Sequence, residues 1–120
     1  MTELDHDPAA LDNLAALGGA SLVLRVLQTL AELLERLPKE LREASAAPSP
    51  ELLQRRAHSI LSASGYAGET NLRAAAHAIE HAVRSGDLAA ISALLDQFDR
   101  AAEAAMPRII AAISAWKYRA

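Results

Sequence analysis

One histidine near the middle of the chain, His58, has the surroundings that best suit chemistry. It lies in a segment that reads as a helix opened by Ser49-Pro50-Glu51, since proline is favoured in the first helical turn. On a helical wheel, His58 falls on the same side as Arg55 and Ser62. The opposite side is small and apolar, as expected of a face that packs on a core, and comprises Leu53, Ala57, Ile60 and Ser64. The pattern therefore predicts an exposed imidazole that a large partner can reach.

The residues around His58 form the motif Ala57-His58-Ser59-Ile60-Leu61-Ser62-Ala63-Ser64-Gly65. This motif resembles the signature of histidine-containing phosphotransfer (HPt) domains, which read Ala-His-x-Leu-Lys-Gly-x-Ser-Gly or a close relative. Ile60 keeps the apolar position, and Ala57, His58, Ser64 and Gly65 keep their types. Leu61 stands where the family usually has lysine, and Ser62 stands where it usually has glycine.

The resemblance extends over most of the chain, from about Leu11 to Ile113. Three further segments fit the family's layout in order and spacing: Leu17-Gly18-Gly19, Asn71-Leu72-Arg73-Ala74 and Ser85-Gly86-Asp87-Leu88. The resemblance implies a phosphorelay intermediate, which is a phosphocarrier rather than a true enzyme. His58 would accept a phosphoryl group from a receiver aspartate or a sensor histidine kinase and pass it to a response regulator receiver domain.

The chemistry of a phosphocarrier histidine sets three requirements. A histidine with the ordinary pKa of about 6.5 has a free nucleophilic nitrogen near neutral pH. It must be exposed, because phosphoryl transfer is in line and the donor belongs to another protein. Nearby positive charge stabilises the phosphoryl oxygens. Leu61 cannot supply that charge, so we expect Arg55, one turn before His58 on the same face, to be the charge stabiliser.

The surface that the resemblance assigns to partners lies on the solvent side of the His58 helix and the helix that follows. Besides His58 and Arg55, its expected members are Ser59, Leu61, Ser62, Gly65 and Arg73. Mg²⁺ would belong to the partner receiver domain, so we expect no cofactor or metal in this chain. An alternative is a degenerate HPt-like binding module, which docks a receiver or kinase without efficient transfer because Leu61 replaces the family lysine.

A second motif, His77-Ala78-Ile79-Glu80-His81, has the H-x-x-E-H order of inverted zincins. Two histidines one turn apart can share a metal, but no distant carboxylate ligand or substrate cleft is implied. We therefore expect a solvated face here, with one histidine beside the core, rather than a zinc hydrolase.

Composition limits the other possibilities. The chain has 120 residues, of which 52% are hydrophobic and 3% aromatic, with net charge −3 and no cysteine. It can therefore form one compact core of aliphatic helices. The scattered basic residues argue against nucleic acid binding, and no uninterrupted apolar run reaches membrane-spanning length. We expect a cytoplasmic monomer without a membrane partner, although the leucine-rich run Leu22 to Leu41 leaves dimerisation open.

The pattern of apolar and helix-ending residues predicts an all-α, up-down four-helix bundle with an additional short N-terminal helix. Residues 1–7 read as a flexible leader, and residues 8–120 as a single HPt-like domain. The short helix should end at Gly18-Gly19. A long helix from Ser21 should then continue beyond Pro38 with a kink. The remaining helices should cover about 50–64, 69–84 and 88–116, the last one bent by Pro107.

Overall fold

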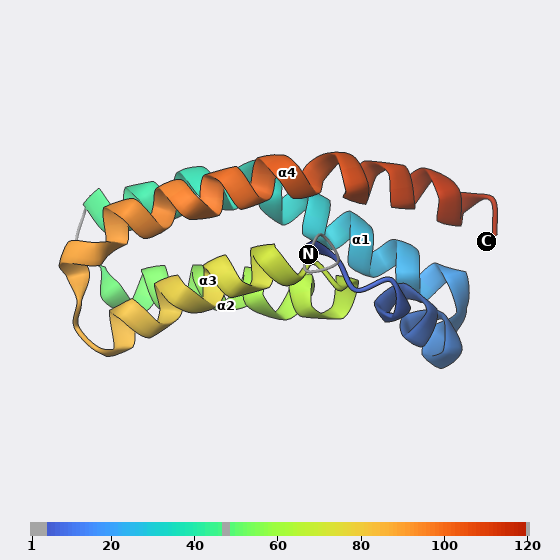
Figure 1. Cartoon of the computed structure of the whole chain (residues 1–120), viewed down its shortest axis with the longest axis horizontal. Coiled ribbons are helices and arrows are strands. Elements are labelled where there is room, and N and C mark those ends of the chain that lie inside the picture. The colour runs from blue at the N-terminus through green and yellow to red at the C-terminus, as the bar shows by residue number, and fades with distance from the viewer. Residues whose placement is uncertain (1–4, 47–48, 120) are drawn as a thin grey trace.

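The computed structural model describes residues 5–46 and 49–119 and shows an all-helical bundle (Figure 1). Its four long helices are α1 (Ala9–Ala46), α2 (Pro50–Ala67), α3 (Thr70–Arg84) and α4 (Ile91–Lys117). A short 3-10 turn, η2 (Leu88–Ala90), leads into α4. The predicted all-α four-helix architecture is confirmed. Residues 1–4 of the predicted leader, and Ala47 and Pro48 of the predicted connector, lie outside the described residues.

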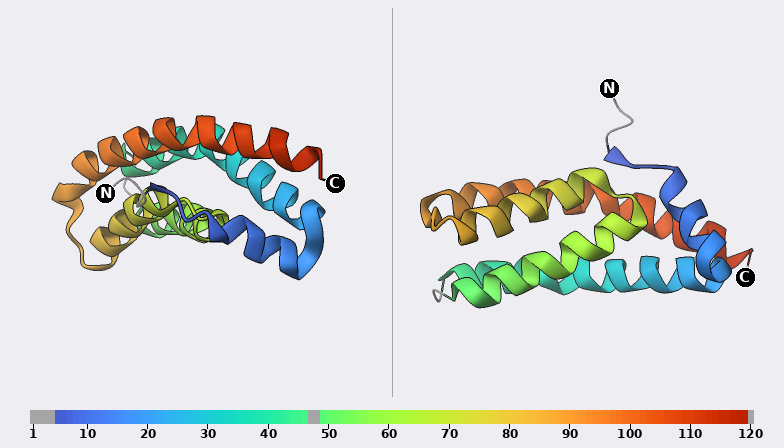
Figure 2. Two further views of the ribbon diagram at one scale, coloured as in Figure 1. Left: turned by 45° about the vertical axis from the view of Figure 1, so that its right-hand side comes forward. Right: turned by 90° about the horizontal axis from the view of Figure 1, so that it is seen from below.

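The helices pack in a closed ring, in which α1 contacts α2 and α4, and α3 contacts the same two helices. The shorter α2 and α3 form a hairpin along one side of the longer α1 and α4 (Figures 1 and 2). At one end of the molecule, α1 and α4 extend beyond this hairpin, and α4 is curved along its length (Figure 2).

The first helix contains a break at Gly18 and Gly19. Gly18, with a φ of −146° and a ψ of 15°, and Gly19, with a φ of 73° in the region that favours glycine, are the two non-helical residues within α1. The residues before this break run at an angle to the rest of α1 (Figure 2). The predicted separate N-terminal helix is therefore not confirmed as an element of its own, because these residues form the leading part of α1. The start of α1 is capped, since the Asp7 carboxylate accepts a hydrogen bond of 3.0 Å from the amide of Ala9.

Pro38 lies inside α1 without interrupting it. The non-helical dihedral angles within α1 are confined to Gly18 and Gly19, so the break lies there and the kink predicted at Pro38 is not seen in the backbone angles. The prediction that the helix continues beyond Pro38 is confirmed, because Leu41 is fully buried on the same face.

The same helix contains an 18-residue window of mean hydropathy 1.6, so it is long and apolar enough to cross a membrane by length and composition. Core helices of soluble proteins pass the same test, and 22% of this window is buried in the bundle. The sequence pattern had not indicated such a segment, because Arg25 and Gln28 interrupt its apolar residues.

The core is aliphatic, as the composition predicts. Phe98 is its one fully buried aromatic side chain among the described residues, and alanines such as Ala57, Ala76 and Ala105 lie at the helix contacts. These small residues let the helices approach closely, so that leucine and isoleucine side chains fill the space between them. The largest fully buried aliphatic side chains are Val23, Leu27, Leu30, Leu37, Leu41, Ile60, Leu72, Ile79 and Ile109.

The turn between α2 and α3 differs from the prediction. The predicted loop began at Gly65, but α2 continues through Gly65 and ends at Ala67, with Gly68 as its left-handed cap at φ 76°. The amides of Gly68 and Glu69 close this end on the carbonyls of Gly65 and Ser64. The connection is therefore shorter than expected, and it holds α2 and α3 as a tight hairpin.

Arginines tie the helices together outside the core. Arg108 of α4 reaches the almost fully buried Glu69, with 2.7 Å between Nη2 and Oε1. The hydrogen bond to Glu69 raises the pKa of Arg108 above its ordinary value. Arg42 of α1 pairs with Asp96 and Asp99 of α4.

Candidate phosphoryl-acceptor site

His58 lies on the exposed face of α2, as predicted, and its side chain is 59% exposed. The predicted core face of the same helix, Leu53, Ala57, Ile60 and Ser64, is buried. The hydroxyl of Ser64 is buried among apolar groups, but it donates to the carbonyl of Ile60 at 2.5 Å and therefore remains hydrogen-bonded. This packing fixes the rotation of α2 about its axis and so holds His58 towards solvent.

A buried carboxylate of the neighbouring helix holds the imidazole. Glu80 of α3 has a side chain only 7% exposed, and its Oε2 lies 3.3 Å from Nδ1 of His58. A carboxylate beside Nδ1 favours a proton on that nitrogen, so the lone pair of the neutral ring lies on Nε2. The two ring nitrogens therefore differ in their surroundings: Nδ1 lies beside the Glu80 carboxylate, and Nε2 is the nitrogen that does not face it.

Positive charge lies beside this histidine on both helices. Nη2 of Arg84, one turn after Glu80 on α3, lies 3.1 Å from Oε2 of Glu80, and the Arg84 side chain is 63% exposed. Arg84, His58 and Arg55 line one open depression in the protein surface, so the predicted proximity of Arg55 to His58 is present. The other residues that line it are Glu51, Gln54, Ser59 and Glu80.

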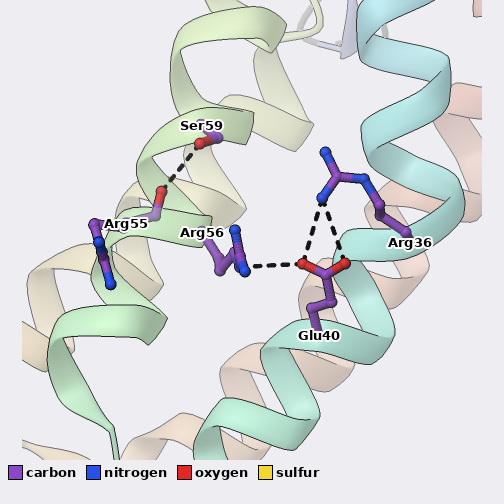
Figure 3. A network of polar contacts seen from close by, with 5 residues as sticks. All are labelled: Arg36, Glu40, Arg55, Arg56 and Ser59. Atoms are coloured by element: carbon purple, nitrogen blue, oxygen red, sulfur yellow. Dashed lines mark hydrogen bonds and ion pairs between the residues drawn. The ribbon is translucent and has the colours of Figure 1, made fainter.

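Polar contacts on the other side of α2 fix the helix to α1 (Figure 3). Nε of Arg56 lies 3.1 Å from Oε1 of Glu40, which also pairs with Arg36. The Arg56–Glu40 orientation gives an ion pair without a well-aligned hydrogen bond. The hydroxyl of Ser59 donates to the carbonyl of Arg55 at 3.1 Å, so this predicted partner-binding residue presents its oxygen close to its own helix.

The two positions that depart from the HPt signature are both half-buried. Leu61 packs against the hydrophobic core, so only part of its side chain is exposed to a docking partner. Ser62 lies next to it, and on the helical wheel it lies on the side of His58. The replacement of lysine by Leu61 therefore removes a charge near His58 and adds an apolar contact between α2 and the core.

Gly65 and Arg73, the last two predicted partner-binding residues, lie against each other. A Cβ atom built on Gly65 would come within 3.2 Å of Nε and 3.3 Å of Cδ of Arg73. The structure thus brings a residue of α3 across the outer face of α2, two turns beyond His58. Both residues are exposed.

The H-x-x-E-H segment is not arranged as a metal site. His77 and His81 are exposed and their rings stack, with centroids 6.4 Å apart. Glu80 points instead towards His58 and Arg84, and within residues 5–46 and 49–119 no cluster of three metal-binding side chains is present. The expected solvated face is present at His77 and His81, so the expectation that one histidine packs beside the core is wrong, and Glu80 of the same segment is buried.

Sequence reasoning missed Glu80 and Arg84 as members of the site. One signal was available: Glu80 directly follows Ile79, so it borders the buried face of α3, and Arg84 follows one turn later on the same side. What the sequence lacked was the rotation of α3 against α2, which decides that this border faces His58.

The four-helix bundle and the exposed His58 on the packed α2–α3 hairpin are features expected of an HPt domain. The comparisons with known proteins agree. The Hpt domain family model matches residues 21–116, and the chain therefore belongs to the Hpt domain family. Membership supports a role in histidine phosphotransfer within two-component signalling, where Hpt domains interact with kinases and receiver domains.

The fold is similar to that of a solved phosphotransfer protein. The crystal structure of histidine-containing phosphotransfer protein B (HptB) from Pseudomonas aeruginosa PAO1 matches with a TM-score of 0.82 and 22% sequence identity. The match covers 92% of this chain and 95% of that chain. No curated protein matches the chain in sequence.

Proposed function

We propose that His58 receives a phosphoryl group from a receiver aspartate or from a sensor histidine kinase, and passes it to a response regulator receiver domain. The observation that carries this proposal is the exposed imidazole whose Nδ1 lies 3.3 Å from the buried Glu80, which leaves Nε2 open to solvent. In the receiving step, Nε2 forms a bond to phosphorus and the phosphorus–oxygen bond to the donor aspartate breaks. The donor leaves as a carboxylate, and the reverse step regenerates neutral His58.

Glu80 supports this step through the opposite ring nitrogen. As Nε2 bonds to phosphorus, the imidazole ring becomes positively charged while Nδ1 keeps its proton. The Glu80 carboxylate stabilises that charge and holds the ring plane in one orientation, as an acidic partner does for a histidine in a nucleophile–base pair. Because Glu80 is almost fully buried, it has little freedom to turn away from His58.

Arg84 and Arg55 provide the positive charge that Leu61 cannot. Both line the depression around His58, so their guanidinium groups are within reach of a phosphoryl group on Nε2. Arg84 is the better placed of the two, since its contact with Glu80 holds it at the site. Arg55 is exposed and makes no ion pair within the part of the chain that the structure describes.

The remaining assignments follow the family. The protein acts as a phosphocarrier and not as a true enzyme, and Mg²⁺ is bound by the receiver partner. It works as a cytoplasmic monomer that binds neither nucleic acid nor membrane. Its docking face combines Ser59, Leu61, Ser62, Gly65 and Arg73 with the residues around His58.

A phosphotransfer assay tests the proposal. Wild-type protein is incubated with phosphorylated receiver domains and kinases of its own genome, alongside His58→Gln and the control His77→Gln. We expect acid-labile phosphate on wild type and on His77→Gln, and none on His58→Gln, because only His58 is held by a buried carboxylate. Label that persists in His58→Gln contradicts the proposal. Binding to a receiver without any label on wild type would favour the degenerate binding module, which is the second candidate because Leu61, half-buried against the core, stands where the family has lysine.

A further inference from the structure

We propose that Arg73, laid across Gly65, is a preformed electrostatic docking contact for a carboxylate on the rim of the receiver partner. This inference rests on the proposed function. It assigns to Gly65 and Arg73 a role in partner affinity that is separate from the chemistry at His58.

The first argument is that the backbone does not need glycine at position 65. Gly65 lies inside α2, and the described glycines with positive φ are Gly19, Gly68 and Gly86. A glycine within a helix lowers helix stability relative to alanine. What Gly65 supplies is space, since a Cβ atom there would lie 3.2 Å from Nε of Arg73. Alanine there would crowd Nε and Cδ of Arg73, so the Arg73 side chain would have to shift.

The second argument is that Arg73 is held without being neutralised. Its stem lies over Gly65, which reduces the side-chain freedom that binding would otherwise remove. Yet it makes no ion pair with any described residue. The arginines that do make ion pairs are Arg36, Arg42, Arg56, Arg84 and Arg108. An exposed guanidinium that pairs with no described residue is suited to a carboxylate from outside the molecule.

Position separates this contact from the phosphoryl site. Gly65 follows His58 by two helical turns, or about 10 Å along the axis. Arg73 is also not among the residues that line the depression around His58. A standard interface covers about 800 Å² on each partner, which is a patch wider than the spacing of about 10 Å between His58 and Gly65. A receiver that reaches His58 therefore also covers Arg73.

Charge favours an acidic partner at this face. Across the α2–α3 hairpin, residues 50–84, there are four arginines and three glutamates, whereas the whole chain has a net charge of −3. The hairpin that presents His58 is thus the basic part of an acidic protein. Complementary charge at the rim of an interface raises association rates and selects among partners more than it adds affinity.

The test uses the full chain and the receiver domain that binds it in the transfer assay. Equilibrium affinity is measured for wild type, Arg73→Gln, Gly65→Ala and the double variant over a salt series. Arg100→Gln is the matched control, since Arg100 is exposed on α4 and makes no ion pair among the described residues. We expect Arg73→Gln to weaken binding by roughly threefold to fivefold at low salt, the range of an exposed ion pair, and to flatten the salt dependence.

Gly65→Ala is the sharper variant because it leaves every charge in place. We expect it to weaken binding about as much as Arg73→Gln, and the double variant to be no weaker than either, since all three remove one contact. Thermal unfolding checks that each variant is folded. The proposal is overturned if Arg73→Gln binds as tightly as wild type, or no more weakly than Arg100→Gln, or if the two single effects add.

A small phosphoryl donor separates this inference from the proposed function. Phosphoramidate transfers its phosphoryl group to an accessible imidazole nitrogen and releases ammonia, with no docking surface involved. Arg73→Gln and Gly65→Ala should be labelled at the wild-type rate. A slower rate in these variants would place Arg73 in the phosphoryl site and overturn the docking role. Absence of label from wild type would count against His58 as acceptor, and the affinity ratios would still decide the docking contact.

Discussion

Two buried carboxylates of the α2–α3 hairpin, Glu69 and Glu80, differ in what lies opposite them. Glu69, just before α3, faces Arg108 alone, and its side chain is 3% exposed. Glu80, near the other end of α3, is 7% exposed but faces two side chains that are mostly in solvent, His58 and Arg84. Glu69 links the start of α3 to α4 through Arg108. Glu80 contacts the exposed His58, which we propose as the phosphoryl acceptor.

The difference shows how burial alone fails to separate structural from functional charges. A buried carboxylate is tolerated only when its charge is compensated. Arg108 is a permanent cation, so the pair at Glu69 keeps one state. In the proposed transfer, His58 would change charge as the phosphoryl group binds and leaves, while Arg84 would stay paired with Glu80. The exposed fraction of the side chains that pair with a buried carboxylate, and not that of the carboxylate itself, distinguishes the candidate site at Glu80 from the structural pair at Glu69.

The largest expected effect is on stability, at Glu69. Replacing Glu69 with alanine leaves Arg108 without its carboxylate and should lower the free energy of unfolding by about 2–3 kcal/mol, below the range for fully buried pairs because Arg108 is partly exposed. Urea denaturation measures it. Glu43→Ala, at an exposed position of α1, is the control and should change stability by less than about 0.5 kcal/mol. If Glu69→Ala lowers the free energy of unfolding no more than Glu43→Ala does, the pair between Glu69 and Arg108 does not stabilise the fold.

The next effect is on transfer, at Glu80. Glu80→Ala removes the group that orients Nδ1 and should slow phosphorylation of His58 by roughly tenfold, as the loss of an orienting partner does elsewhere. Glu80→Gln keeps an acceptor for Nδ1 and should recover part of that rate, which separates orientation from charge. Single-turnover labelling measures both. Equal rates in wild type and Glu80→Ala would make Glu80 a structural residue like Glu69.

The smallest effect concerns Leu61. Leu61→Lys restores the family's residue and should speed labelling of His58 by roughly twofold to fivefold, because an ammonium near the phosphoryl oxygens adds to Arg84 and Arg55. Its stem can cover the same apolar surface while the charge reaches solvent. Leu61→Met, which adds no charge, is the control and should leave the rate unchanged. A rate gain in both variants would assign the effect to packing.

Periodicity was enough to predict the helices and the exposed side of α2, because one apolar stripe per helix decides which way it faces. The Hpt-like motif then selected His58 among four histidines. Glu80 could not be assigned in this way, since its partner lies on another helix and depends on how α3 is rotated. The sequence predicts a loop or a loosening of the helix from Gly65, whereas in the structure α2 continues through Gly65. Because glycine has no Cβ atom, this position leaves room for Arg73.

The short connection at Gly68 and Glu69 also bears on how the protein folds. It joins α2 and α3 directly, so the contact between His58 and Glu80 closes only a small loop of chain and costs little entropy. By contrast, contacts between α1 and α4 join distant parts of the sequence, such as Arg42 and Asp99, which are 57 residues apart. Local contacts of this kind form quickly, whereas distant ones limit the folding rate. We therefore expect the contacts between α2 and α3 that build the candidate site to form early in folding, before the distant contacts between α1 and α4.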